Sequence, residues 1–186
     1  QTPFYAEAGG QIGDKGMFAS KASTGTILDC KKQGKVYIHK AFIEKGKIKT
    51  GDVIKMSVEK EKRSAIAIHH SSTHLVHAAL REVLGDHVKQ KGSLVDENKL
   101  RFDFSHDKPL TQDEISKIES IVNKEGLNNL EVKTELMNID DARKSGAMAL
   151  FGEKYDDEVR VLTMRDNSYS VELCGGTHVK RTGDIG

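Results

Sequence analysis

Apolar and polar positions alternate in short runs through the first third of the chain, and glycines interrupt the runs. Four runs have the length of strands; they lie at residues 17–20, 25–29, 35–43 and 52–58. Short strands at this spacing, with turns between them, are typical of a small barrel. We therefore predict a β-barrel subdomain over residues 1–64, although a barrel by itself assigns no function.

The pattern becomes helical over residues 68–85, where an apolar stripe recurs every three or four positions. Gly85 follows the stripe and is a natural C-cap, because glycine adopts the backbone conformation that ends a helix. A second helix is predicted to begin at Thr111. Thr111 and Glu114 have the spacing of a capping box, in which each side chain binds the backbone N–H of the other residue.

Strands and helices are mixed in the rest of the chain. Strands are predicted at residues 91–96, 99–104, 131–138, 148–151, 159–164 and 171–173. The first two would form a hairpin, and Asp140 or Asp141 would cap a short helix that ends at Lys144. Because these elements do not form regular βαβ units, we predict an α+β domain over residues 65–186.

The composition of the chain limits the class of protein that it can be. The chain is 37% apolar and 31% charged with a net charge of +1, so it can bury a core, and bulk charge does not indicate a nucleic-acid binder. No apolar run approaches the roughly 20 residues of a membrane span, and no signal peptide is visible. We therefore expect a cytoplasmic protein without membrane contact. The lack of an initiator Met leads us to expect a fragment of a longer protein.

Two residue pairs carry the clearest chemistry. His70 and His74 lie four apart in the predicted helix, so their imidazoles share one face. Cys174 and His178 enclose two glycines, which favours a tight turn. Three imidazoles and one thiolate suit one tetrahedral Zn²⁺ per chain, which would also stabilise the fold by joining distant segments. His69 is a rival to His70, but it lies off the face of His74.

Several longer motifs carry a resemblance to a known family. They are Phe4-Tyr5-Ala6-Glu7-Ala8-Gly9-Gly10-Gln11, residues 70–75, Gln90-Lys91-Gly92-Ser93-Leu94, residues 146–155 and residues 174–178. In this order they closely resemble the editing region of bacterial-type alanyl-tRNA synthetase, across essentially the whole chain. The editing domain of threonyl-tRNA synthetase and free-standing alanyl-tRNA editing proteins are similar but more distant.

The resemblance implies a fold and a function. The fold would be a small β-barrel followed by an α+β editing domain of the threonyl/alanyl-tRNA synthetase type. The activity would be hydrolysis of seryl- or glycyl-tRNA(Ala), with the charged tRNA 3′ end as partner. The family's activation site has no counterpart here, so we expect no tRNA charging. Two alternatives remain: a free-standing deacylase of the same family, or a zinc-stabilised tRNA-binding module without activity.

The resemblance also implies residue roles. His70, His74, Cys174 and His178 match the zinc ligands of the family. Four protein ligands make a closed site, which favours a positioning role for the ion unless one ligand is displaced by water or substrate.

The predicted catalytic residues are Gln90, Cys174 and Thr73. An amide cannot act as a base, so Gln90 would act through hydrogen bonds. Thr73 would either face the pocket or bond its own backbone.

A further set is predicted to bind substrate: Gly9, Gly10, Gln11, Thr177, Glu172 and Lys91. The glycine stretch could be a pocket element or only a turn, and the Thr177 hydroxyl has the same two alternatives as that of Thr73. Glu172 would hydrogen-bond a ligand imidazole or face solvent. Lys91 would contact phosphate or remain an ordinary surface charge.

Overall fold

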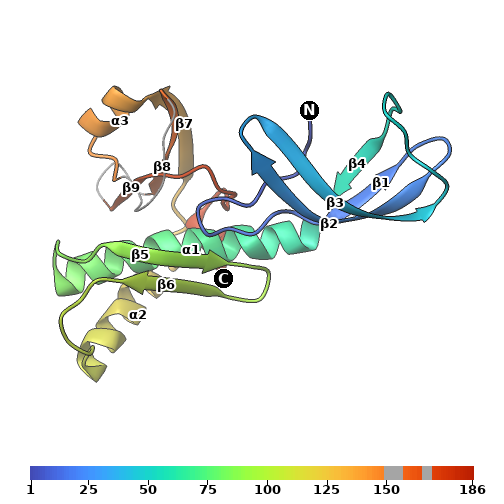
Figure 1. Cartoon of the computed structure of the whole chain (residues 1–186). Coiled ribbons are helices and arrows are strands. Elements are labelled where there is room, and N and C mark those ends of the chain that lie inside the picture. Colours follow the sequence, from blue (N-terminus) through green and yellow to red (C-terminus); the bar gives the residue numbers. More distant parts are fainter. Residues whose placement is uncertain (149–156, 165–168) are drawn as a thin grey trace.

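The computed structural model describes residues 1–148, 157–164 and 169–186 (Figure 1). It has a mixed α/β architecture with antiparallel sheets and few helices. Figure 1 shows the long helix α1 (Lys60–Leu84) crossing the molecule, with one sheet toward each of its ends. Among the described residues, no helix is long and apolar enough to cross a membrane.

The N-terminal sheet has four antiparallel strands in the order β3-β2-β1-β4. The strands are β1 (Gly16–Ala19), β2 (Thr24–Gln33), β3 (Val36–Lys45) and β4 (Lys55–Val58). Strands β3 and β4 are its edges, so the described chain forms an open sheet and the predicted barrel is not confirmed. Strand β2 also continues to Gln33, beyond residue 29 where the predicted strand ends, and the chain reverses at Gly34, whose φ is +57°.

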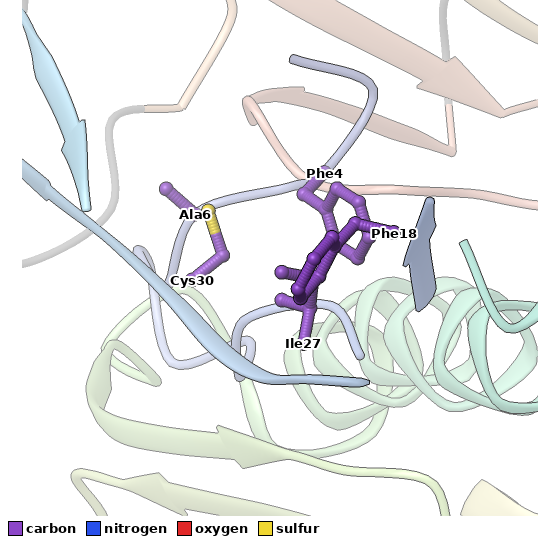
Figure 2. Packing of buried hydrophobic residues seen from close by; sticks show 5 residues of the cluster. All are labelled: Phe4, Ala6, Phe18, Ile27 and Cys30. Carbon is purple, nitrogen blue, oxygen red and sulfur yellow. The ribbon is translucent and has the colours of Figure 1, made fainter. Parts of the chain in front are cut away.

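One face of this sheet is covered by the chain's first residues. Figure 2 shows the Phe4 ring against Phe18 and Ile27, with Ala6 beside Cys30. All five side chains are buried. The segment that leads into the glycine-rich stretch is therefore anchored in this core through Phe4 and Ala6.

Helix α1 begins at Lys60, eight residues before the predicted start at residue 68. The apolar stripe could not reveal the first turn because residues 60–63 are all charged, and the N-cap Glu59 makes no side-chain capping bond. Arg63, in the early part of the helix, pairs with the buried carboxylate of Asp14. The helix ends at Gly85 as predicted, with a φ of +111° there.

The predicted hairpin and second helix are confirmed. Strands β5 (Gln90–Val95) and β6 (Leu100–Phe104) pair antiparallel, and α2 (Gln112–Leu127) follows. The Thr111 hydroxyl accepts from the Glu114 N–H at 3.2 Å, and the Glu114 carboxylate accepts from the Thr111 N–H at 2.8 Å. This is the complete capping box that the spacing predicted.

The last sheet has three antiparallel strands in the order β7-β8-β9. They are β7 (Val132–Asn138), β8 (Glu158–Met164) and β9 (Ser170–Leu173), with the short helix α3 (Ile139–Lys144) after β7 and a 3₁₀ turn η1 (Thr182–Ile185) near the end. The cap of α3 is Asn138, whose side chain accepts from the Asp140 N–H at 2.9 Å, so the predicted aspartate cap was wrong. Most of the predicted strand at 148–151, and of the motif at 146–155, lies outside the described residues.

Candidate metal centre

The two predicted ligand pairs meet at one point. His70 and His74 project from α1, and Cys174 and His178 lie in the turn after β9; one ligand atom of each lies within 4.8 Å of all the others. The Cys174 Sγ is 3.4 Å from the His70 Nε2 and 3.3 Å from the His178 Nε2. Helical spacing positions the first pair, and the end of β9 at Leu173 positions the second.

The two glycines between Cys174 and His178 have different roles. A Cβ atom at Gly176 would overlap the His70 ring and lie 2.9 Å from the Gln11 Oε1, whereas a Cβ at Gly175 would meet no atom within 4 Å. Gly176 is therefore required because the turn passes against the His70 imidazole. Gly175 is under no such steric constraint.

The outer nitrogen of His70 is held by Gln11, which is fully buried. The Gln11 Oε1 lies 2.6 Å from the His70 Nδ1 and accepts from the Thr177 N–H at 2.9 Å, and the Gln11 Nε2 donates to the Thr177 hydroxyl at 2.9 Å. A backbone N–H can only donate, so the amide oxygen must be the acceptor and the His70 Nδ1 the donor. The remaining nitrogen, Nε2, faces Cys174 and is the atom that can coordinate a metal.

Glu172 holds the outer nitrogen of His74 in the same way. Its carboxylate is buried and accepts from the His74 Nδ1 at 2.9 Å and from the His77 Nδ1 at 3.2 Å. Of the two alternatives left open by the sequence, the structure contains the contact with the imidazole of His74, a predicted ligand. His77 was missed, although positions 70, 74 and 77 share one helical face and could have indicated it.

The hydrogen bonding of the cluster atoms leaves one position that suits a cation. The His74 Nε2 is buried and has no hydrogen-bond partner among the described residues, while the other ring nitrogen is held by Glu172. An unpartnered buried polar atom is costly, and a bound cation would satisfy it. Three imidazole nitrogens and one thiolate are ligands that zinc prefers, so the residues fit the ion.

The electrostatics of the cluster also suit a cation. Burial would raise the pKa of the Cys174 thiol, but His74 and the other imidazoles hold it well below its usual value. Burial lowers the pKa of His178 to about 4. Burial opposes the charged form of His74 as well, yet Glu172 and Cys174 raise its pKa to about 10. The cluster thus favours a thiolate and a neutral His178, the forms that coordinate metals.

The remaining predicted site residues are placed less centrally. Thr73 is buried, and its hydroxyl donates to the His69 carbonyl at 2.9 Å, which is the local backbone bond of the two alternatives. Gly9 and Gly10 have positive φ values, and the Gly10 carbonyl accepts from the Val95 N–H at 2.8 Å. The glycine turn therefore places Gln11 beside the cluster.

Gln90 lies at the other end of β5 from this contact. Val95 is next to Gln11, whereas Gln90 pairs with Phe104 across the hairpin, five residues or about 17 Å away along the strand. None of the described contacts of Gln90 reaches the cluster, and its catalytic role stays a prediction. Lys91, the next residue on β5, is exposed, and its phosphate contact also stays a prediction.

Comparison with family models defines the class of protein. Residues 1–62 match the model "tRNA synthetases class II (A)", and residues 159–186 match "Threonyl and Alanyl tRNA synthetase second additional domain". The first match contains Gln11 and the second contains Glu172, Cys174 and His178. The chain thus combines segments of a class II aminoacyl-tRNA synthetase on the two sides of helix α1.

Whole-chain comparison identifies the family. The chain is 56% identical to the alanine–tRNA ligase of Rhodopseudomonas palustris, 53% to that of Parvibaculum lavamentivorans and 54% to that of Ruthia magnifica, in each case over its entire length. It belongs to the alanyl-tRNA synthetase family. It spans about 22% of the length of each of these relatives.

Proposed function

We propose that this chain is an editing segment that hydrolyses the ester between serine or glycine and tRNA(Ala). The observation that carries the proposal is the convergence of His70, His74, Cys174 and His178, with Gln11 and Glu172 holding two of the imidazoles. The match of residues 159–186 to the second additional domain of threonyl and alanyl tRNA synthetases supports it. The predicted boundary between the two subdomains, at residues 64 and 65, stays a prediction. The closure of the N-terminal sheet into a barrel also stays a prediction.

The reaction adds water to the ester carbonyl and releases the amino acid and the ribose hydroxyl of the tRNA. His70, His74, Cys174 and His178 would hold one Zn²⁺, which supplies a positive charge that positions the substrate. Gln11 and Glu172 would keep the imidazoles oriented while the substrate enters. The full set of four protein ligands favours positioning over activation of water, because a catalytic zinc keeps one position open.

The need for such a reaction follows from the limits of binding. Serine differs from alanine by one hydroxyl and glycine by one methyl group. A single binding pocket discriminates such changes by only about 10- to 200-fold. A separate hydrolytic site that removes the wrong amino acid supplies the remaining accuracy.

The test is a deacylation assay with seryl-tRNA(Ala), glycyl-tRNA(Ala) and alanyl-tRNA(Ala). We expect the chain to hydrolyse the first two and spare the third. Cys174→Ala should lower the rate at least about tenfold, as expected when a metal ligand or its surroundings are altered. Cys30→Ala is the matched control, because Cys30 lies in the N-terminal core away from the cluster.

Two outcomes would contradict the proposal. If Cys174→Ala keeps both its metal and the full rate, the cluster does not serve hydrolysis. If the unaltered chain binds tRNA(Ala) but releases no serine or glycine, the chain is a tRNA-binding module instead. The closed ligand set is the observation that favours this second candidate.

A further inference from the structure

A second group of metal-ligating side chains lies beyond the C-terminal end of helix α1. One ligand atom each of His87, His106 and Asp107 lies within 4.8 Å of the other two. We propose that these three side chains form a second site, which binds a divalent transition-metal ion such as Zn²⁺. The site is separate from the proposed editing reaction, and it stands or falls independently of that reaction.

The two groups of ligands are too far apart to share one ion. His74 is the last ligand of the first cluster along α1, and ten further helical residues up to Leu84 carry the chain about 15 Å away from it. His87 lies three residues beyond Leu84. An ion held by the first cluster therefore does not reach His87.

The two imidazoles of the second group face each other. The His87 Nε2 lies 2.8 Å from the His106 Nδ1, and the rings are stacked with 5.1 Å between their centres. Two lone pairs at this distance would repel each other, so a proton lies between the nitrogens when no ion is bound. A metal ion in that place would accept a lone pair from each ring.

The Asp107 carboxylate gives the group its negative charge. Its Oδ1 lies 3.7 Å from the His106 Nδ1. The Glu114 carboxylate is near enough to interact electrostatically with His106, and Lys108 offsets one of the two negative charges. The surroundings of the neutral imidazoles thus keep a net negative charge, which favours a cation.

One ring is fixed and the other is free to adjust. The His106 side chain is only 8% exposed, and its Nε2 is buried without a hydrogen-bond partner among the described residues, so Nδ1 is the nitrogen that can reach an ion. His87 is exposed. A tetrahedral zinc ion holds two imidazole nitrogens about 3.3 Å apart, so the His87 ring would need to move by about 0.5 Å.

Ser105 holds the two ligand-bearing loops together. Its N–H donates to the Lys89 carbonyl at 3.0 Å, and its hydroxyl accepts from the Lys89 N–H at 3.0 Å. The same hydroxyl donates to the His87 carbonyl at 3.1 Å. The two histidines are therefore kept side by side, although they lie 19 positions apart in the sequence.

The ligand types define the class of ion and its relative affinity. Imidazole and carboxylate ligands suit Zn²⁺, Ni²⁺ and Cu²⁺. Three protein ligands leave a position open to water and include no thiolate, so this site should bind zinc more weakly than the first cluster. A chain purified without added metal should therefore keep one zinc, and the second ion should bind only when zinc is added.

The experiment titrates Zn²⁺ into the full chain, with the first cluster already filled, in competition with a chromophoric chelator. We expect a second ion per chain. His87→Ala should weaken its binding at least about tenfold, as should Asp107→Asn, which keeps the shape of the side chain but not its charge. Both variants should bind the first ion as the unaltered chain does. X-ray absorption of the doubly loaded chain should show an average of about half a sulfur neighbour per zinc.

His39→Ala is the matched control. His39 lies on β3, shares a hydrogen bond of 2.8 Å with the Thr2 hydroxyl, and belongs to neither group of ligands. Its replacement should leave the binding of both ions unchanged. Equal loss of the second ion in His39→Ala and His87→Ala would overturn the proposal and indicate non-specific binding to surface histidines.

Two further outcomes would contradict the second site. One is a chain that binds a single ion even in excess zinc. The other is a second ion that binds His87→Ala and Asp107→Asn as tightly as it binds the unaltered chain. In either case the contact between His87 and His106 would be a hydrogen bond and nothing more.

Discussion

The Gln11 side chain accepts a hydrogen bond from His70 across 59 residues of sequence, with 2.6 Å between Oε1 and Nδ1. Gln11 is completely buried, so this contact involves no solvent. It joins the glycine-rich N-terminal segment to helix α1 and, through Thr177, to the turn after β9. The residue therefore orients the imidazole of His70, a predicted ligand, and connects three distant parts of the chain.

Replacing Gln11 should weaken metal binding. In Gln11→Ala the His70 ring loses the acceptor that fixes its orientation, and we expect the affinity for Zn²⁺ to fall about 10- to 100-fold. The measurement is competition with a chromophoric chelator. Gln90→Ala is the matched control, since none of the described contacts of Gln90 reaches the cluster. Equal affinity of the two variants would contradict the assigned role of Gln11.

The two neighbouring glycines give a paired test of the turn. Gly176→Ala should displace the His70 ring and strongly reduce zinc binding, because the added Cβ overlaps that ring. Gly175→Ala should bind zinc as the unaltered chain does, since the added Cβ meets open space. Zinc content of the purified variants measures both. Full zinc content in Gly176→Ala would show that the turn does not pack against His70 as described.

Zinc binding should release about one proton at pH 8. Without metal, the raised pKa of His74, about 10, keeps its ring doubly protonated at this pH, and zinc must replace the Nε2 proton. The lowered pKa of Cys174 means that the thiol has already lost its proton. Titration calorimetry in buffers of different ionisation enthalpy measures the release. A value near zero would indicate that His74 is neutral before binding.

The raised pKa of His74 also determines how the stability of the metal-free chain changes with pH. The pKa of His74 is higher in the folded state than its ordinary value of 6.5, so its contribution is complete below about pH 6.5 and is lost as the pH rises toward 10. Metal-free protein should therefore unfold at lower urea concentration at pH 9.5 than at pH 6.5. Added zinc should reduce this difference, because the bound form contains neutral His74.

The capping box of α2 should contribute stability without affecting the site. Thr111→Ala removes the acceptor for the Glu114 N–H, and we expect the free energy of unfolding to fall by about 1 kcal/mol. Urea unfolding of the zinc-bound chain measures the change. Zinc affinity and deacylation should be unchanged. A loss of zinc affinity would mean that α2 supports the cluster more directly than its contacts indicate.

Features set by local sequence were the ones that could be predicted. The period of the apolar positions and the spacing of polar residues were enough to predict the hairpin, the capping box at Thr111 and the two residue pairs of the cluster. Each of these features depends on residues a few positions apart. The start of α1 was misplaced because its first turn, residues 60–63, is charged rather than apolar. Asn138 was missed as a cap because the two aspartates that follow it offer the same chemistry.

Long-range contacts could not be predicted from local pattern. Nothing near Gln11 in the sequence indicates that its amide would meet His70. The helical face that His77 shares with His74 does not reveal that Glu172 is their common partner. Both contacts depend on how α1 packs against segments from opposite ends of the chain. The resemblance to alanyl-tRNA synthetases placed Gln11 near the site, and Glu172 was singled out because it precedes the second ligand pair in the sequence. The bonding of both residues to the imidazoles required the structure.

X-ray absorption at the zinc edge tests the central claim most directly, namely that four side chains from α1 and the turn after β9 bind one metal ion. We predict one zinc per chain with one sulfur neighbour at about 2.3 Å and three nitrogen neighbours at about 2.0–2.1 Å. In Cys174→Ala the sulfur signal should disappear. A zinc shell in the unaltered chain that contains no sulfur would contradict the account.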